Sequence, residues 1–393
     1  MAYTDKLKGL HEESYGLDKK NKPMKKIIVA CDSFKGCLTS SEANRAVASA
    51  VSDRCPDASV VCLPVSDGGD GMLEAFASAL RADKVSVCVH DPMMRRVTSC
   101  YGIAPDGTAV IEIAQAVGLT LVSPADRSPM VATSYGVGEL IADAVRRGCR
   151  DFIVGLGGSA TSDAGIGMLR ALTDLLTRGG TIDDALQGRL KGCRFTLACD
   201  VRNPLCGPDG AAYVFAPQKG ATPEMLPQLD ARARRFADFS ARHFGYDRSA
   251  ESGAGAAGGL GYAFMQYLGA TFRSGADYLL NLLGYEKLLS GAALVITGEG
   301  SSDRQTLMGK LPQRIMDRAL AAKVPTVLLS GRVSDLKSLI KAGFADVVCI
   351  NPEDCDLEEA MHKEVAMKRI AEAAEAVIAR ITTDKTDNSK SDK

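Results

Sequence analysis

KKIIVACDSF, residues 25–34, and the stretch that follows it decide the fold class. The first stretch is an apolar, β-branched run that predicts a buried strand, and SSEANRAVASAVSDRC at 40–55 has the pattern of a helix with Ser40 or Ser41 as its N-cap. SVVCLPVSDGGDG at 59–71 is a second predicted strand, which ends in a glycine-rich turn. Strands that alternate with helices are typical of a parallel, doubly wound sheet.

The pattern changes at 85–118, where alternation of period two, interrupted by turn residues, predicts hairpins. The strand-and-helix alternation returns from about Ala292 with ALVITGEG, PTVLLSGR and ADVVCIN. We therefore predict an α/β protein in which a mixed-sheet domain is inserted into a discontinuous parallel-sheet domain. The predicted bounds are a mobile N-terminal tail at 1–23, the parallel-sheet domain at 24–82 and 290–380, the inserted domain at 83–289 and a disordered C-terminal tail at 381–393.

The composition argues against several functional classes. The 47 basic and 48 acidic residues leave a net charge of -1, and tryptophan is absent, so no basic or aromatic surface for nucleic acid is expected. No apolar run is long enough to span a membrane, and the N-terminus lacks the apolar core of a signal peptide. The 12 cysteines are scattered and form no C-x-x-C pair. We expect a cytoplasmic protein that binds neither nucleic acid nor membrane, as a monomer or a homodimer.

Five segments combine glycine or other small residues with acidic or hydroxyl side chains, each at the end of a predicted strand. Ligands of open α/β sheets bind at the carboxyl ends of the strands. In the first segment, CDSFKG, Lys35 could hold a phosphate or carboxylate group as a point charge, beside Asp32 and Ser33. The alternative is a solvated loop lysine beside a capping aspartate.

The second segment, SDGGDG, is a candidate anion-binding loop. Gly68 and Gly69 would let the backbone approach a ligand, and the following helix would offer its N-terminal N–H groups. Asp67 and Asp70 could instead hold Mg²⁺ through its waters. A tight turn with an N-cap remains the structural alternative.

The third segment, GLGGSATSDAGIGM at 155–168, has a higher density of glycine and hydroxyl residues than turn chemistry requires. Gly157, Gly158 and Ser159 precede a predicted helix, which is an arrangement suited to anion binding. Asp163 could orient a substrate hydroxyl or bind a metal ion.

The fourth segment, ACDVRNPLCGPDGAAYVFAPQKG, begins at the end of an apolar run. Asp200 could act as a general base or a Mg²⁺ ligand, and a structural Asx-turn is the alternative. Asn203 precedes a proline, which favours an extended conformation, and Lys219 lies in a second loop nearby in the sequence.

The fifth segment, TGEGSSDRQTLMGK, resembles a Walker A loop but is not one, because Arg304 stands where the first glycine is required. The segment nevertheless carries oxygen ligands and one cation close together: Glu299, Asp303, Thr306 and Lys310.

GAGAAG at 253–258 matches the letters of a dinucleotide-binding fingerprint, and it includes Gly255 and Gly258. The preceding residues are polar and do not predict a strand, so the context that confirms such a fingerprint is missing. Helix packing or anion binding explains this segment equally well.

The inventory of candidate residues suits phosphoryl transfer. Glycine-rich loops, carboxylates and lysines can position reactants, neutralise phosphate charge and accept a hydroxyl proton. The residues alone indicate a phosphate-handling enzyme and do not identify its acceptor.

In this order and spacing, the motifs resemble the bacterial glycerate kinase family. They are DSFKG at 32–36, DGGDG at 67–71, GGSATSDAG at 157–165, CDVRNPLCGPDGA at 199–211, PQKGATPEM at 217–225, GAGAAGGLG at 253–261 and TGEGSSDRQTLMGK at 297–310. The resemblance implies a flavodoxin/Rossmann-like discontinuous domain with an inserted mixed-sheet domain. It also implies transfer of phosphate from ATP to D-glycerate with Mg²⁺, usually to 2-phosphoglycerate, in glycerate and glyoxylate catabolism.

The family usually has glutamate at Asp70 and threonine at Met72, and Met72 lacks the hydroxyl that could contact a metal ion or phosphate. Asp200 is the expected base, with Asp67 as the alternative, and Lys35 is expected to assist in catalysis. Residues expected to bind substrate or phosphate are Asp32, Ser33, Gly68, Gly69, Asp70, Gly157, Gly158, Ser159, Asn203, Lys219, Gly255, Gly258, Thr306 and Lys310; those expected near Mg²⁺ are Asp163, Glu299 and Asp303. A kinase of another hydroxy acid, a nicotinamide dehydrogenase and an organic-acid sensor are the competing functions.

Overall fold

The computed structural model describes residues 26–66, 68–69 and 71–387, and the chain divides into two compact units. One unit combines the chain up to Val65 with the chain from Leu283 onward, and the other spans Ser66–Leu282. The predicted N-terminal tail lies outside the described residues. A mixed α/β fold with one parallel sheet and one mixed sheet confirms the predicted fold class.

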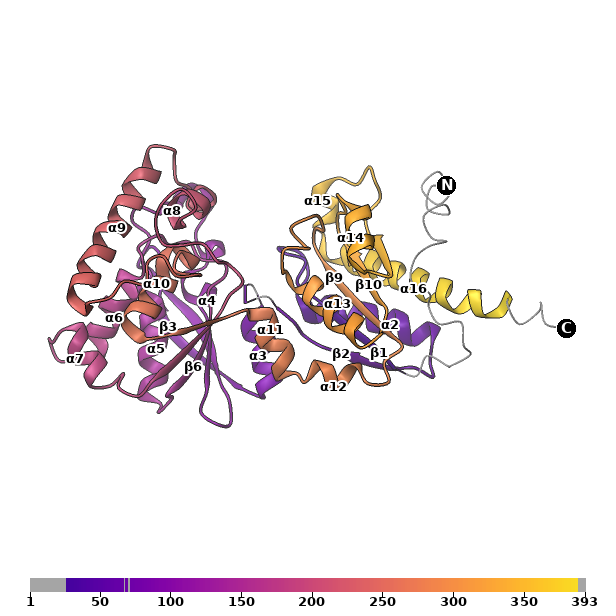
Figure 1. Cartoon of the computed structure of the whole chain (residues 1–393), viewed down its shortest axis with the longest axis horizontal. Coiled ribbons are helices and arrows are strands. Elements are labelled where there is room, and N and C mark those ends of the chain that lie inside the picture. Colours follow the sequence, from indigo (N-terminus) through magenta and orange to yellow (C-terminus); the bar gives the residue numbers. More distant parts are fainter. Residues whose placement is uncertain (1–25, 67, 70, 388–393) are drawn as a thin grey trace. The chain divides into compact units, whose positions relative to one another are not determined.

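The first unit is built on a five-stranded parallel sheet with the order β2-β1-β9-β10-β11. Figure 1 labels β1, β2, β9 and β10 of this sheet. Numbered within this unit alone, the order is 2-1-3-4-5, which is the flavodoxin-like arrangement. Its strands are β1 Lys26–Cys31, β2 Ser59–Cys62, β9 Leu294–Glu299, β10 Thr326–Ser330 and β11 Asp346–Cys349; its helices are α2 Ser40–Arg54, α12 Tyr285–Leu289, α13 Leu311–Ala321, α14 Leu336–Ala342, α15 Leu357–Ala360 and α16 Lys363–Asp387.

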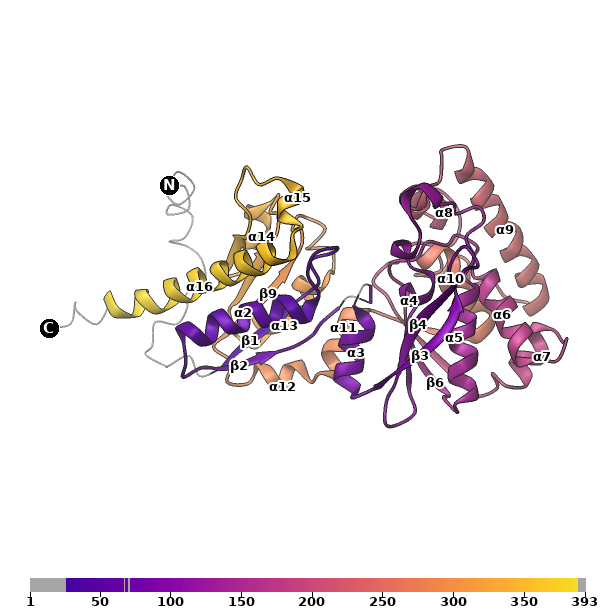
Figure 2. The same cartoon turned by 180° about the vertical axis from the view of Figure 1, so that it is seen from behind.

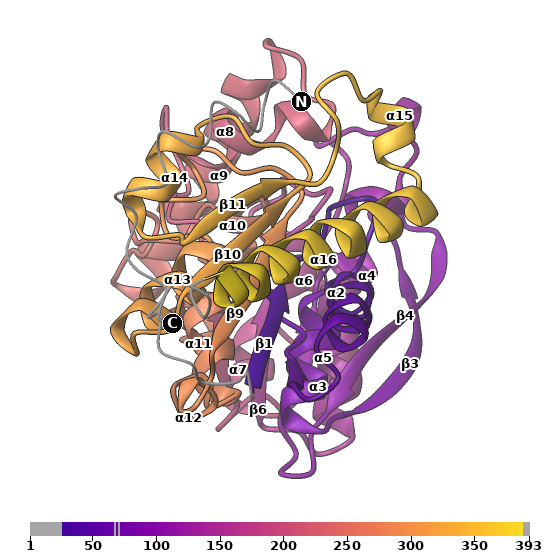
Figure 3. The same ribbon diagram turned by 90° about the vertical axis from the view of Figure 1, so that its right-hand side faces the viewer.

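Helices cover both faces of this parallel sheet. α2 and α16 lie side by side on one face, as two views show (Figures 2 and 3), and their core includes Val327 and Leu329 of β10. Leu328, between those two residues, belongs instead to the core formed with α13 and α14. Successive side chains of a strand point to opposite faces, so an apolar strand without alternation is what a sheet buried on both faces requires.

α2 begins at Ser40, as predicted, but its N-cap lies one residue before the first predicted cap. Its N-cap is Thr39, whose hydroxyl accepts a hydrogen bond from the N–H of Glu42, and the Glu42 carboxylate accepts one from the N–H of Thr39. This reciprocal pair is a capping box. Ser40 is buried instead, and its hydroxyl donates to the carbonyl of Cys31 and accepts from the N–H of Val65.

The second unit is built on a six-stranded mixed sheet with the order β3-β4-β5-β6-β7-β8. β3, β4 and β5 are antiparallel neighbours, and β5 to β8 run parallel. Its strands are β3 Asp83–His90, β4 Arg96–Ile103, β5 Ala109–Glu112, β6 Asp151–Gly155, β7 Arg194–Ala198 and β8 Thr271–Arg273; its helices are α3 Met72–Leu80, α4 Ala114–Val117, α5 Tyr135–Arg146, α6 Ile166–Leu176, α7 Ile182–Gln187, α8 Ala211–Phe215, α9 Met225–Phe244, α10 Ala256–Leu268 and α11 Gly275–Leu282, with short 3₁₀ turns η1 Leu119–Leu121, η2 Pro124–Asp126 and η3 Pro217–Lys219.

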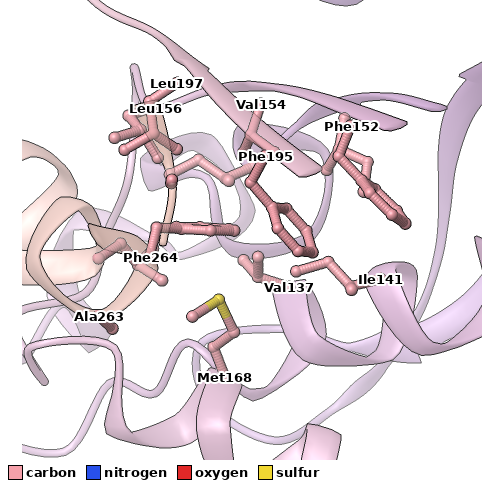
Figure 4. Packing of buried hydrophobic residues seen from close by; sticks show 14 of the residues in the cluster. Val137, Ile141, Phe152, Val154, Leu156, Met168, Phe195, Leu197, Ala263 and Phe264 are labelled. Atoms are coloured by element: carbon pink, nitrogen blue, oxygen red, sulfur yellow. The ribbon is translucent and has the colours of Figure 1, made fainter. Parts of the chain in front are cut away.

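The main core of this unit lies between the mixed sheet and helices α5, α6 and α10 (Figure 4). Phe152 of β6 and Phe195 of β7 stack with ring centroids 4.5 Å apart, and Phe264 of α10 packs beside them. Aromatic pairs of this kind add to the stabilisation that comes from burying their area. The core holds the strands in register, so the positions of the loops at their carboxyl ends are fixed.

α3 belongs to the mixed-sheet unit, whereas we predicted it in the parallel-sheet domain. It packs on β4, β5 and α11 with Met72 and Phe76 buried, and the ring of Phe76 lies 5.7 Å from that of Tyr278 in α11. The first boundary therefore falls between Val65 and Ser66 and not after residue 82. The reason is that α3 buries its apolar stripe on the mixed sheet.

The second boundary and the C-terminal end of the last helix also differ from the predicted bounds. Tyr285 of α12 is buried in the parallel-sheet unit, where its hydroxyl donates to the carbonyl of Ile315, so the boundary precedes Leu283 rather than residue 290. α16 continues to Asp387, so 381–387 are helical where we predicted disorder. Polar residues without proline or glycine extend an existing helix easily, because elongation adds one hydrogen bond per residue. None of the helices described is long and apolar enough to cross a membrane.

Candidate functional site

The parallel sheet reverses its strand order between β1 and β9, and two predicted segments meet at their carboxyl ends. The N–H of Asp32 donates to the carbonyl of Gly298 (2.8 Å), and a Cβ placed on Gly300 would lie 3.7 Å from the backbone nitrogen of Lys35. In doubly wound sheets this reversal point is where ligands bind. Asp32 is buried, and the side chain of Lys35 is exposed to solvent at the same edge.

A buried carboxylate, Glu299, lies at the centre of this edge. Its Oε1 accepts hydrogen bonds from the hydroxyls of Ser302 (2.9 Å) and Thr306 (2.6 Å). Its Oε2 lies 4.0 Å from Nζ of Lys310. Burial raises the pKa of Glu299, while the Thr306 hydroxyl and Lys310 oppose that rise. A perturbed, hydrogen-bonded carboxylate at a strand end is a candidate functional group.

The other predicted residues of this segment surround Glu299 unequally. Thr306 is fully buried, and its hydroxyl also accepts from the N–H of Asp303, so it orients the carboxylate from behind. Asp303 is half-buried and caps a turn through the N–H of Gln305. Lys310 is the N-cap residue of α13 and therefore lies at the positive end of that helix. The hydroxyl oxygen of Ser33 is buried and has no partner among the described residues.

In the mixed-sheet unit, three glycine-containing segments pack closely at the carboxyl ends of β6 and β7. The N–H of Gly157 donates to the carbonyl of Gly68 (3.2 Å), and a Cβ on Gly157 would lie 2.2 Å from the Cα of Gly69. Gly158 accepts a hydrogen bond from the N–H of Leu119. Only glycine permits this approach, because any side chain at 157 would overlap the neighbouring backbone. The predicted residues Asp67 and Asp70 lie outside the described residues.

Glu112, which the sequence analysis did not single out, already occupies the N-terminus of α3. Its buried carboxylate accepts hydrogen bonds from the N–H groups of Gly71 (3.3 Å) and Leu73 (2.9 Å). A carboxylate there complements the positive end of the helix. These N–H groups, predicted to face an anionic ligand, thus have a protein partner. The sequence did contain a sign of this role, because Glu112 is the lone charged residue inside the apolar run AVIEIA.

Asp163 connects the starts of α5 and α6. Its Oδ2 accepts hydrogen bonds from the N–H (2.8 Å) and hydroxyl (2.9 Å) of Ser134 and from the N–H of Gly167 (3.1 Å). Its Oδ1 accepts one from the N–H of Gly165 (3.1 Å). The carboxylate is buried and its acceptor positions are largely used. Its role as a Mg²⁺ ligand stays a prediction, while its role in joining two helices follows from these contacts.

We expect Asp163→Asn to lower the free energy of unfolding by about 2 kcal/mol, because the new NH₂ group would face backbone donors and leave one or two of them unpaired. Urea denaturation of both proteins measures the change. The matched control is Asp238→Asn on the exposed side of α9, which should remain within about 0.5 kcal/mol of the parent. Equal stability of the two variants would contradict the assigned role.

Lys219 ends η3 and is buried, with 2% of its surface exposed. Its ammonium donates to the hydroxyl oxygen of Ser159 (2.9 Å) and to the carbonyl of Thr161 (2.6 Å). Burial lowers the pKa of Lys219 to about 7, and the charge of Asp163 opposes that shift. The structure therefore brings together two residues, Ser159 and Lys219, that are 60 positions apart in the sequence.

Asp200 follows β7 and is half-buried. The N–H of Ala276, at the start of α11, donates a hydrogen bond to Oδ2 of Asp200, and the nitrogen and oxygen are 3.4 Å apart. Asn203 donates through its side chain to the carbonyl of Asp209 (2.8 Å), and its own carbonyl accepts from the N–H of Gly255 (2.9 Å). Asn203 and Gly255 thus hold two loops against each other.

Gly258 also packs against a site loop. A Cβ at Gly258 would lie 2.0 Å from the carbonyl oxygen of Thr161, and its φ of +68° is in the left-handed region. The N–H of Ala164 donates to the carbonyl of Gly258. α10 begins at Ala256, and no strand of the described chain precedes it directly, so the dinucleotide context is absent from GAGAAG. Close packing explains these glycines.

Comparison with known proteins decides the family. The model of the glycerate kinase family matches residues 27–382. The chain belongs to the glycerate kinase family. The glycerate kinase of Bacillus subtilis (strain 168) is 38% identical over 365 residues, which cover 88% of this chain and 96% of the relative. The glycerate 2-kinase of Escherichia coli (strain K12) is 38% identical over 340 residues, which cover 82% and 89%.

The fold of a solved relative agrees with this assignment. A crystal structure assigned to glycerate kinase 2 of Salmonella typhimurium LT2 superimposes with a TM-score of 0.75 at 35% identity, and the match covers 92% of this chain and 99% of that chain. The resemblance inferred from the motifs is therefore confirmed, and the protein is a kinase by family. The nicotinamide dehydrogenase alternative loses its support.

Proposed function

We propose that this protein is an ATP-dependent glycerate kinase, a phosphotransferase with an alcohol acceptor, which converts D-glycerate to phosphoglycerate. The observation that carries the proposal is that the matched family region, 27–382, contains both strand-end clusters described above. The relative from Escherichia coli is named glycerate 2-kinase, which supports 2-phosphoglycerate as the favoured product. Glycerate and glyoxylate catabolism is the pathway that such a product would serve.

We assign the proton transfer to Asp200. A hydroxyl of glycerate gives its proton to the Asp200 carboxylate while its oxygen bonds to the γ-phosphorus of ATP, and the bond from that phosphorus to the β–γ bridging oxygen breaks to release ADP. The place of Asp200 after β7, at the ligand-binding edge of a parallel sheet region, supports this role. Asp67 remains the alternative base.

We assign phosphate charge neutralisation to Lys35 and Lys310. Lys310 begins α13, so the ammonium and the positive end of the helix act together on an anion. Lys35 is exposed on the loop after β1, where a ligand can reach it. Both residues flank the edge at which Asp32 and Glu299 lie, and this supports a nucleotide phosphate site at the switch point of the sheet.

We assign Mg²⁺ to Glu299 and Asp303, on the loop that also carries Lys310. No cluster of three His, Cys, Asp or Glu side chains that could hold a metal ion occurs in 26–66, 68–69 or 71–387. One or two carboxylates plus substrate phosphates are what Mg²⁺ uses in kinases, so an oxygen-only pair fits. When bound, the ion neutralises charge on the β- and γ-phosphates. Asp163 is assigned to helix positioning, because its oxygens already accept five hydrogen bonds.

We assign ligand binding in the mixed-sheet unit to the loop of Gly157, Gly158 and Ser159, with Gly68 and Gly69 packed against it. Asn203, Gly255 and Gly258 keep the surrounding loops closely packed. We expect the protein to act in the cytoplasm, because none of the twelve cysteines, all in the described part of the chain, forms a disulfide, which suits a reducing compartment.

The decisive test is an assay of the protein with MgATP and D-glycerate. We expect ADP release that depends on glycerate, and NMR of the product should identify 2-phosphoglycerate. L-Glycerate and lactate, tested in parallel, separate a glycerate kinase from a kinase of other hydroxy acids. Binding of glycerate without any ADP release would identify a sensor instead, and a rate independent of glycerate would refute the proposal.

A further inference from the structure

A buried cation lies beneath the loop at 159–162 without a directly bonded counter-ion. The ammonium of Lys219 has three N–H donors, and its partners in the described part of the chain, Ser159 and Thr161, are both neutral and use two of them. Burying a charge is costly unless it is paired. Lys219 must therefore become neutral or acquire an anion.

The charged groups around Lys219 do not neutralise it by contact. Asp163, in the loop before α6, favours the charged ammonium, but its oxygens are bonded to Ser134, Gly165 and Gly167. Arg232 of α9 donates to the carbonyl of Ser162 (2.8 Å) and adds positive charge beneath the same loop. Arg127, whose backbone lies beside Gly220, is a second arginine near this turn. The hydrogen bonds of the Lys219 ammonium within the described chain therefore go to neutral oxygens and not to a carboxylate.

Two hydroxyl groups of the same loop have no partner. Thr161 is fully buried and Ser162 nearly so, and Oγ1 of Thr161 and Oγ of Ser162 make no hydrogen bond with any described residue. Buried polar atoms in native proteins are nearly always paired, so unpaired ones call for a specific explanation. A ligand with acceptor oxygens would satisfy both hydroxyls and the remaining N–H of Lys219.

We propose that the 159–162 loop and Lys219 form a subsite for one anionic oxygen group, a carboxylate or a phosphoryl group, and that the group binds together with a proton taken up by Lys219. The proposal rests on the proposed function for the source of the anion, since glycerate, ATP and phosphoglycerate all carry such a group. Above its lowered pKa, the neutral amine of Lys219 then becomes a charged counter-ion when the anion binds.

Anion binding and protonation of Lys219 should favour each other. Ligand-free Lys219, with its pKa lowered to about 7 by burial, is mostly neutral at pH 8 and mostly charged at pH 6. A bound anion favours the charged form and raises the pKa of the ammonium. Binding should therefore take up more protons at pH 8 than at pH 6.

Isothermal titration calorimetry in two buffers of different ionisation enthalpy measures this uptake directly. D-Glycerate, MgADP and 2-phosphoglycerate are titrated separately at pH 6 and pH 8. Uptake with D-glycerate alone assigns the subsite to the carboxylate, and uptake only with MgADP or 2-phosphoglycerate assigns it to a phosphoryl group. Heats that do not depend on the buffer at pH 8 for all three compounds would overturn the proposal.

Variants separate Lys219 from other titrating groups. Lys219→Met should abolish the uptake at pH 8, whereas Lys191→Met, at an exposed position of the same unit, should retain it. Thr161→Val keeps the lysine and removes one hydroxyl of the subsite. It should weaken ligand binding about tenfold without changing the proton uptake per bound ligand. This variant tests the subsite even if Lys219→Met does not fold. Full uptake in folded Lys219→Met would refute the role of Lys219. Uptake without glycerate-dependent ADP release would reject the proposed function and keep the subsite.

Discussion

Asp200→Asn is expected to lower kcat by about 10²–10⁴-fold, the usual contribution of a general base. The amide of asparagine cannot accept the hydroxyl proton of glycerate, yet it keeps the shape of the side chain. Its oxygen can still accept from the N–H of Ala276, so the start of α11 should remain in place. Steady-state kinetics with saturating MgATP and D-glycerate measure the effect, and KM for glycerate should change much less than kcat.

Asp209→Asn is the matched control for this substitution. Asp209 is exposed in the same loop region, and Asn203 contacts its backbone carbonyl rather than its carboxylate. Its variant should keep kcat within about threefold of the parent. If Asp200→Asn retains turnover within about tenfold, Asp200 is not the base, and Asp67→Asn becomes the substitution to test.

Glu299→Gln is expected to lower kcat by about 10²–10³-fold, because it removes the buried negative charge at the proposed phosphate and metal edge. The glutamine oxygen can still accept from Ser302 and Thr306, so the local structure should persist. If Glu299 helps to hold Mg²⁺, the Mg²⁺ concentration needed for half-maximal rate should also rise at fixed ATP.

The pH dependence provides a second measurement for Glu299. Burial raises the pKa of this carboxyl, so it loses its charge at a higher pH than an ordinary glutamate does, and the rate should fall earlier on the acidic side. The Gln variant lacks this titration and should show a flatter acidic limb. Glu353→Gln, at an exposed position of the same unit, should leave both profiles unchanged. A Glu299→Gln enzyme with normal rate and Mg²⁺ requirement would exclude the assignment.

Local sequence patterns predicted the two sheets but not the first domain boundary or the N-cap of α2. The apolar run before Asp32 predicted β1 because a strand buried on both faces needs no polar alternation. The boundary at Val65 was missed because the destination of α3 depends on the apolar surface of another part of the chain. The N-cap at Thr39 was missed by one residue, although Glu42 completes its capping box and was visible in the sequence.

In the candidate site, the glycine-rich loops could be predicted from the sequence, but the hydrogen-bond partners of individual side chains could not. Glycine-rich strand ends were predictable, since parallel strands bring their carboxyl ends to one edge. The partners of Asp163 and Thr306 were not predictable. The hydroxyl of Thr306 donates a hydrogen bond to Glu299 from within the loop that follows β9. The N–H of Ser134 donates one to Asp163, which is 29 residues away in the sequence. Glu112 caps α3 across 39 residues, which no local pattern encodes.

By itself, KKIIVACDSF together with the repeated strand, turn and helix pattern determined an α/β protein with a parallel sheet, and the ordered motifs determined the family. Hydrophobic periodicity and motif spacing are properties of the chain alone, so they can be recognised without contacts. Tertiary structure decided which helix joins which sheet, which carboxylates are already satisfied by backbone donors, and that Lys219 is buried beside Ser159. Those outcomes depend on burial and on partners distant in the sequence, and both exist only after the chain has packed.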